Sequence, residues 1–261
     1  MQTVTMTITP AQASEWLKNK NTRNRNLSLN RAKLYAEDMK NGNWHKTHQG
    51  IAFYEDGVIA DGQTRLKAIE ISGCPVEMMV TFGVHDSSAI AIDAHRMRST
   101  NDQIAISGKA SWIGKNEIAV VNMFGILSGT NKLSTSEIVK FCELHKSTLD
   151  FVKEHFNTSA KYISTVPVRC AIAVAYGKEE KTRLIAFCKI MITGVMDEPG
   201  DVAAIRLRER LLLDGRMFQT SESGRYECFL LASRAIKAFC DHEQIKKLQL
   251  PKEQIYALNI N

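Results

Sequence analysis

The sequence has few prolines and glycines, no long apolar run and no paired cysteines, and each absence excludes a class of protein. Its 261 residues include 15 Gly and five Pro, too few for a collagen-like or low-complexity chain. No apolar stretch approaches the roughly 20 residues that a membrane-spanning helix needs. The first residues lack the basic segment followed by an apolar stretch that marks a secretory signal. We therefore expect a globular, cytoplasmic protein with no membrane partner.

The cysteines and histidines also lack the spacing of metal ligands. Six Cys and seven His are present, but no C-x-x-C, H-x-x-x-H or H-E-x-x-H pattern occurs among them. Most of the cysteines stand among apolar neighbours at helical spacing. This pattern predicts buried free thiols rather than a disulfide framework or a zinc site.

Acidic residues are missing from one basic stretch near the N-terminus. The formal net charge is +6, and residues 18–33 contain six Lys or Arg and no Asp or Glu. Such a cluster can attract a polyanion by releasing its counterions, although most basic clusters are solvated faces. Arg23 and Arg25 lie in an Asn-rich linker within it, so they are candidate contacts to a DNA backbone.

The hydrophobic pattern predicts an α+β fold with two domains. Short strands and capped helices alternate in the first part, whereas after about Lys109 the pattern is almost wholly helical. We therefore predict a mixed domain over residues 1–108 and an all-α domain over residues 109–261. In the first domain we expect strands over residues 4–8, 51–54, 58–60 and 75–82, and helices starting after Thr9, after Ser28 and at Arg65.

The segment Asp61-Gly62-Gln63-Thr64-Arg65, at the predicted turn from strand to helix, is the main candidate site. A glycine there lets backbone amides approach a ligand, and the helix that follows supplies unpaired N–H donors. Arg65, on the first helical turn, can grip a phosphate with two hydrogen bonds. Asp61 can hold a metal ion or orient Arg65. The alternative is an ordinary turn, in which Asp61 caps the helix and Arg65 is a surface side chain.

The same segment resembles a known signature. Gly62-Gln-Thr-Arg65-Leu-Lys-Ala68 is similar to the G-x-x-R-x-x-A motif of the ParB/sulfiredoxin-like superfamily, and with Asp61 it resembles the DGQHR variant of many phage and mobile-element proteins. Thr64 stands where that variant has histidine. The resemblance implies a small β-sheet domain in which Gly62 and Arg65 contact nucleotide phosphates, with Asp61, Gln63 and Thr64 beside them.

A second stretch, Asp93-Ala-His-Arg-Met-Arg98-Ser99, resembles the D-x-G-x-x-R-T segment of the same phage proteins. Its position after a strand and a short helix suggests that it closes over the same ligand. Asp93 is then a candidate second carboxylate, Arg98 a phosphate contact and Arg96 a DNA contact. The alternative is a solvated loop in which Asp93 caps the next helix.

These residues lead to one main hypothesis and two alternatives. The main hypothesis is a phage or mobile-element protein, located in the host cytoplasm, that binds a nucleotide or DNA phosphate at the corner. An enzymatic form would be an NTPase, kinase or nuclease that uses a nucleoside triphosphate and Mg²⁺, with Asp61 as metal ligand and Asp61, Arg65 and Asp93 as catalytic residues. The alternatives are a non-catalytic DNA- or protein-binding module and an enzyme of phage nucleotide or base modification. The sequence is compatible with the formation of an oligomer.

Overall fold

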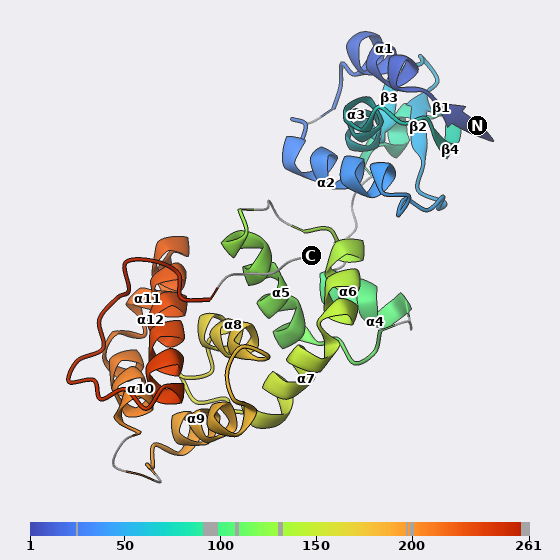
Figure 1. The fold of residues 1–261 in the computed structure, drawn as a ribbon. Helices are drawn as coiled ribbons and strands as arrows, with labels where there is room; N and C mark the ends of the chain where they lie inside the picture. The colour runs from blue at the N-terminus through green and yellow to red at the C-terminus, as the bar shows by residue number, and fades with distance from the viewer. Residues whose placement is uncertain are drawn as a thin grey trace. The chain divides into compact units, whose positions relative to one another are not determined.

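The computed structural model (Figure 1) describes residues 1–24, 26–90, 99–107, 110–129, 133–196, 198 and 201–256. The chain divides into two compact units, unit 1 (Met1–Ser99) and unit 2 (Thr100–Asn261). Helix α4 (Thr100–Ser107) belongs to unit 2, whereas the sequence analysis had placed residues up to 108 in the first domain. Within the described ranges, every helix falls short of the length and apolar character that membrane crossing requires.

Unit 1 is built on a four-stranded sheet in the order β1-β4-β2-β3. Strand β1 (Gln2–Ile8) pairs antiparallel with β4 (Val76–Val84), and β2 (Ile51–Tyr54) forms a hairpin with β3 (Ile59–Asp61). Strands β2 and β4 are parallel, and parallel neighbours need a crossover connection. Helix α3 (Gln63–Ser72) lies in that crossover, so the end of β3 leads directly into a helix.

Helices α1 (Pro10–Lys20), α2 (Leu29–Lys40) and α3 share one apolar core with the sheet. Helix α1 starts as predicted, because the Thr9 hydroxyl accepts the Gln12 N–H at 3.2 Å and proline stands in its first turn. Trp16 packs edge-on against Phe53 of β2, with ring centroids 5.0 Å apart. The other buried members of this core are Ile8, Ala13, Ala36, Met39, Ile51, Ile59, Leu66, Ala68, Ile69, Met78 and Val80.

In unit 2, the regular secondary structure of the described residues is all helical. Helix α8 is its centre, since all of residues 167–175 are buried. Helix α6 starts with a capping box: the Ser134 side chain accepts the Glu137 N–H at 3.3 Å, and the Glu137 carboxylate accepts the Ser134 N–H at 2.7 Å. The helices are α4 (Thr100–Ser107), α5 (Lys115–Leu127), α6 (Thr135–Leu144), α7 (Lys146–His155), α8 (Val166–Ala175), α9 (Lys181–Thr193), α10 (Val202–Asp214), α11 (Met217–Thr220) and α12 (Glu222–Cys240).

The cysteines are free thiols, as the sequence predicted. Cys142, Cys170, Cys188 and Cys228 are buried, whereas Cys74 and Cys240 are half-buried. Burial raises the pKa of Cys142 and of Cys188 to about 12, because the apolar surroundings disfavour the thiolate. These thiols therefore behave as small apolar core groups.

Candidate functional site

The candidate corner lies where β3 ends and α3 begins. Gly62 is the residue before the helix and has φ +101°, in the left-handed region that favours glycine. A Cβ added there would lie 2.6 Å from Ile51 Cδ1 and 3.1 Å from Ile51 Cα. Both the backbone conformation and the lack of space therefore require glycine at this position.

Arg65 is held beside that glycine by three acceptors. Its Nη1 donates to the Gly50 carbonyl at 2.9 Å and to Asp61 Oδ2 at 3.3 Å, and its Nη2 donates to Gln49 Oε1 at 3.4 Å. The Arg65 side chain is 17% exposed and that of Asp61 is 35% exposed. Arg65 is therefore a half-buried side chain bonded to the protein, and differs in this respect from the surface side chain of the alternative interpretation.

Asp61 completes the arrangement from the end of β3. Its Oδ1 accepts the Gly62 N–H at 2.6 Å while its Oδ2 accepts from Arg65. The carboxylate therefore orients Arg65, one of the two roles that the sequence suggested. Its two recognised partners are thus the Gly62 N–H, just before α3, and the Arg65 guanidinium on the first turn.

Gly50 is a residue of the corner that sequence reasoning missed. A Cβ added to Gly50 would lie 1.7 Å from the Met79 carbonyl oxygen of β4, so the chain entering β2 passes directly against the neighbouring strand. This close approach places the Gly50 carbonyl where Arg65 reaches it. The sequence signal for this role is a glycine immediately before a predicted strand, where glycine often marks the close approach of another backbone.

The Asn-rich segment after α1 is also part of the corner. Gln63 is 6% exposed, and its Oε1 accepts from Asn21 Nδ2 at 3.2 Å. Asn24 donates to Asn21 Oδ1 at 2.8 Å and to the Ile59 carbonyl at 2.7 Å. The sequence predicted a linker here, but these bonds attach residues 21 and 24 to β3 and to the start of α3. The Gln63 side chain is buried and its carbonyl oxygen is bonded within the protein, and its predicted contact with a ligand stays a prediction.

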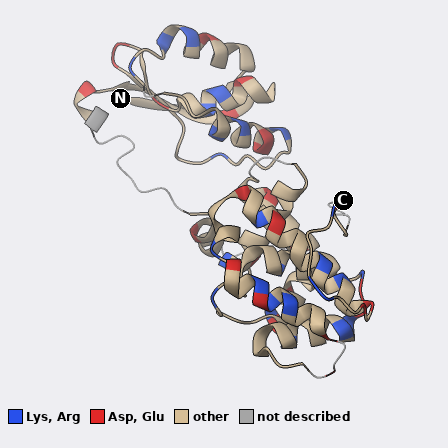
Figure 2. Ribbon diagram, turned by 90° about the vertical axis from the view of Figure 1, so that its left-hand side faces the viewer, with Lys and Arg blue, Asp and Glu red and all other residues tan. Residues whose placement is uncertain are grey.

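The remaining candidate residues are placed as follows. Arg23 forms ion pairs with Asp56 at 2.5 Å and with Asp86 at 3.3 Å, and all three side chains are largely exposed. Part of the basic stretch is therefore neutralised, and the coloured ribbon of Figure 2 shows basic and acidic residues interspersed along the helices. Arg25, Asp93, Arg96 and Arg98 lie outside the described residues.

The start of α3 carries a positive partial charge. The first backbone hydrogen bond at this helix start runs from the Leu66 N–H to the Gly62 carbonyl at 3.0 Å. The Thr64 and Arg65 N–H groups come before it in the chain, so they have no acceptor within the helix. No acidic residue stands in the first turn, and Gly62, the residue before the helix, has no side chain that could cap it. Such a helix end is suited to an anion. Thr64 is half-exposed, so an anion can approach from its side.

The described residues do not fit a protein-held metal ion at this corner. Both Asp61 oxygens already accept hydrogen bonds, one of them from an arginine. Magnesium sites rely on free carboxylate and phosphate oxygens, and among the described residues no group of three His, Cys, Asp or Glu side chains could hold a metal. We therefore derive no step through Mg²⁺.

Comparison with protein-family models, with curated proteins and with solved structures finds no match to this chain. The resemblance of residues 61–68 to the ParB/sulfiredoxin-like signature therefore stays a prediction from the motif. What the structure adds is the geometry of that motif in this chain.

Proposed function

We propose that unit 1 is a phosphate-binding module that takes a phosphate group of a nucleotide or of DNA at the start of α3. The observation that supports it best is the pairing of an uncapped helix N-terminus with an arginine whose orientation is already fixed. The motif resemblance points to the same ligand class. The wider setting that we propose, association with DNA in a phage or mobile element, rests on that resemblance alone.

Because the protein holds Arg65 in place, this side chain is better suited to bind a phosphate than a freely moving surface arginine would be. A side chain that is ordered before the ligand arrives loses little conformational entropy on binding. The three recorded hydrogen bonds use Nη1 and Nη2, and a guanidinium has five N–H donors. Donors therefore remain for a phosphate that approaches over Thr64.

Asp61 limits the affinity of this site for an anion. Its negative charge lies against Arg65 and reduces the attraction of the corner for an anion, because like charges repel. We therefore expect modest affinity for a single phosphate, and stronger binding where further phosphates reach the basic residues of the Asn-rich segment. This expectation favours a non-catalytic module over an enzyme that draws on the Asp61 carboxylate.

The proposal is tested by calorimetric titration of the full chain with ATP, CTP, GTP and a short DNA duplex, each with and without Mg²⁺. The deciding variant is Thr64→Glu, which puts a negative charge into the first turn of α3. That charge stabilises the helix start through the helix dipole but repels a phosphate. We expect at least a tenfold loss of affinity for whichever ligand binds, with no loss of thermal stability.

Asn30→Glu is the matched control, because Asn30 is exposed and occupies the same second position of α2 that Thr64 occupies in α3. It adds the same charge to the same unit and should leave the affinity nearly unchanged. A DNA signal that weakens steeply with salt would identify the ligand as nucleic acid. Equal losses in both variants, or no binding by any of the ligands, would refute the proposed site.

A further inference from the structure

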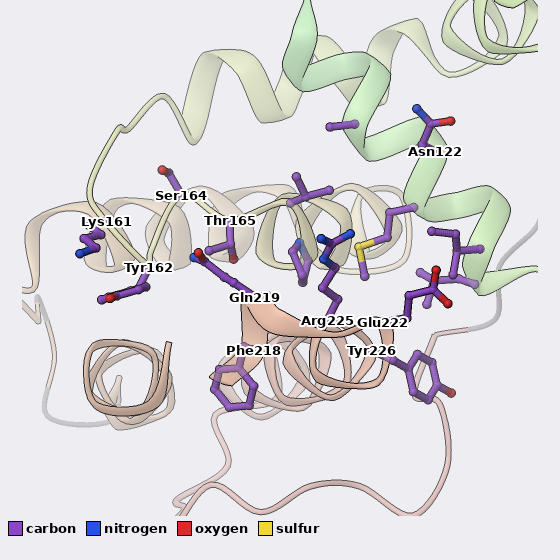
Figure 3. Close-up of a pocket in the computed structure, with 16 residues that line it drawn as sticks. Asn122, Lys161, Tyr162, Ser164, Thr165, Phe218, Gln219, Glu222, Arg225 and Tyr226 are labelled. Atoms are coloured by element: carbon purple, nitrogen blue, oxygen red, sulfur yellow. The ribbon is translucent and has the colours of Figure 1, made fainter. Parts of the chain in front are cut away.

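Unit 2 contains a cavity of about 680 Å³ that the proposed function does not use. Its lining comes from α5, from the turn before α8 with the start of that helix, and from α11 and the start of α12 (Figure 3). All of these elements belong to unit 2. Cavities that hold small ligands commonly measure about 300 to 1,000 Å³, so this one has the size of a small-molecule site.

The cavity has an apolar lining. Its apolar members are Ala119, Met123, Ile126, Leu127, Val166, Pro167 and Phe218. Ile126 is 51% exposed and Tyr226, at the start of α12, is 42% exposed. Apolar side chains gathered at a cavity are a feature of binding surfaces, because covering them removes apolar area from water. The body of the ligand should therefore be apolar or aromatic.

The charged residues around the cavity favour a negative group on that ligand. Lys161 and Arg225 line it, and neither forms an ion pair within the described part of the chain; Lys161 instead lies over the Tyr162 ring at 4.9 Å. Glu222 also lines the cavity, so the balance of formal charge is one positive. Figure 3 shows Gln219, Glu222 and Arg225 projecting from α11 and α12 toward α8 and α5.

The start of α8 adds to that positive character. Thr165 is the residue before the helix and Val166 is its first residue; both line the cavity. No side-chain cap hydrogen bond is formed there, and the first turn holds no acidic residue. The positive end of the helix dipole is therefore directed at the cavity that Arg225 also lines.

The wall that carries Lys161 has a fixed shape. Tyr162 has φ +67°, a conformation that is rare for a bulky residue and marks a constrained segment. The turn is closed by bonds from the Ile163 and Ser164 N–H groups to the Ala160 carbonyl, at 3.2 and 3.0 Å. Gly215 makes room for it, because a Cβ there would lie 2.5 Å from Tyr162 Cβ.

From the apolar lining, Arg225 and the helix end, we infer that this cavity binds a small amphipathic anion: an apolar or aromatic body with one acidic group. The acidic group meets Arg225 and the start of α8, and the body lies on α5 and on Pro167. This site is separate from the corner of unit 1, so either proposal can fail without the other.

The test uses two fluorescent probes on the full chain. Anilinonaphthalene sulfonate and phenyl naphthylamine share the same aromatic body, but only the first carries a negative charge. We expect the sulfonate to bind at a single saturable site, at least tenfold more tightly than the neutral probe. Arg225→Gln should weaken the sulfonate about threefold to tenfold and leave the neutral probe unchanged, because only the charged group meets the arginine.

A second pair of variants locates the site. Ile126→Glu introduces a negative charge at the cavity and should weaken sulfonate binding by tenfold or more. Leu213→Glu is the control, since Leu213 is 82% exposed on α10 and lies outside the cavity lining. Both positions are exposed, so the melting temperature should stay the same. Equal binding of the two probes, sulfonate binding that survives both Ile126→Glu and Arg225→Gln, or no saturable binding would overturn the inference.

Discussion

Replacing Gly62 by alanine tests the close approach that shapes the corner. The added methyl group would meet Ile51 at 2.6 and 3.1 Å while the backbone keeps φ +101°. Gly73 provides a reference within the same helix, because it ends α3 at φ +70° with nothing within 4 Å of an added Cβ. Gly73→Ala therefore carries the backbone penalty alone, whereas Gly62→Ala adds the collision.

The loss of stability from the left-handed backbone and the loss from the collision with Ile51 can be estimated separately. An L-residue in the left-handed region costs about 1 to 2 kcal/mol, and this is the loss of unfolding free energy that we expect for Gly73→Ala. Forcing an extra carbon into a packed site costs about 1 to 3 kcal/mol more, so Gly62→Ala should lose roughly 2 to 5 kcal/mol. Adding Ile51→Val removes the Cδ1 contact at 2.6 Å and should recover about 1 kcal/mol of that loss.

Urea unfolding followed by tryptophan fluorescence measures these losses. Trp16 and Trp44 lie in unit 1 and Trp112 lies in unit 2, so a Trp112→Phe background restricts the signal to unit 1. The four proteins needed for the cycle are the background, Gly62→Ala, Ile51→Val and the double variant.

The result that would refute this reasoning is a Gly62→Ala loss equal to that of Gly73→Ala. It would mean that the chain moves away from Ile51 at no cost. An Ile51→Val change that lowers stability by the same amount in both backgrounds would give the same answer, because the two side chains would then be independent.

Three further outcomes follow from the contacts. Arg65→Ala should lower the unfolding free energy by about 1 to 3 kcal/mol, because the Gly50 carbonyl loses its donor; thermal melting beside Arg65→Lys measures it. Asp201→Ala should lower the unfolding free energy, measured in urea, by about 3 kcal/mol or more. The change leaves the Arg183 guanidinium without its carboxylate in a buried site, where the Asp201 side chain is 3% exposed and that of Arg183 is 15% exposed. Burial lowers the pKa of His145 below 6.5, so unit 2 should lose stability as pH falls below that value, where only the unfolded chain binds the proton; melting curves of His145→Phe should lack this pH dependence.

Local signals predicted the secondary structure well where they were complete within a few residues. Thr9 marked the start of α1, where its hydroxyl accepts the Gln12 N–H and a proline follows it. Gly73 marked the end of α3, where it adopts φ +70°. The short helix α11 was missed, because four residues carry no periodic pattern.

The burial of Arg65 and its bond to the Gly50 carbonyl could not be predicted from such local signals. Its position on the first turn of a helix left open whether it grips a ligand or is an ordinary surface side chain. Its partner is the carbonyl of Gly50, fifteen residues earlier, and the contact exists because β2 enters the sheet against β4. The cavity of unit 2 was missed for a similar reason, since its lining comes from segments between residues 119 and 226 that only tertiary packing brings together.

The edge strand β1 has a consequence for how unit 1 forms. Thr3 lies opposite Thr81, 78 positions later in the chain, and their hydroxyl oxygens are 2.9 Å apart. During synthesis β1 therefore emerges long before its partner, while the β2–β3 hairpin closes locally. Long-range pairing of this kind is slow because a large loop must close first. We expect the first strand to join the nascent domain last, after β4 has left the ribosome.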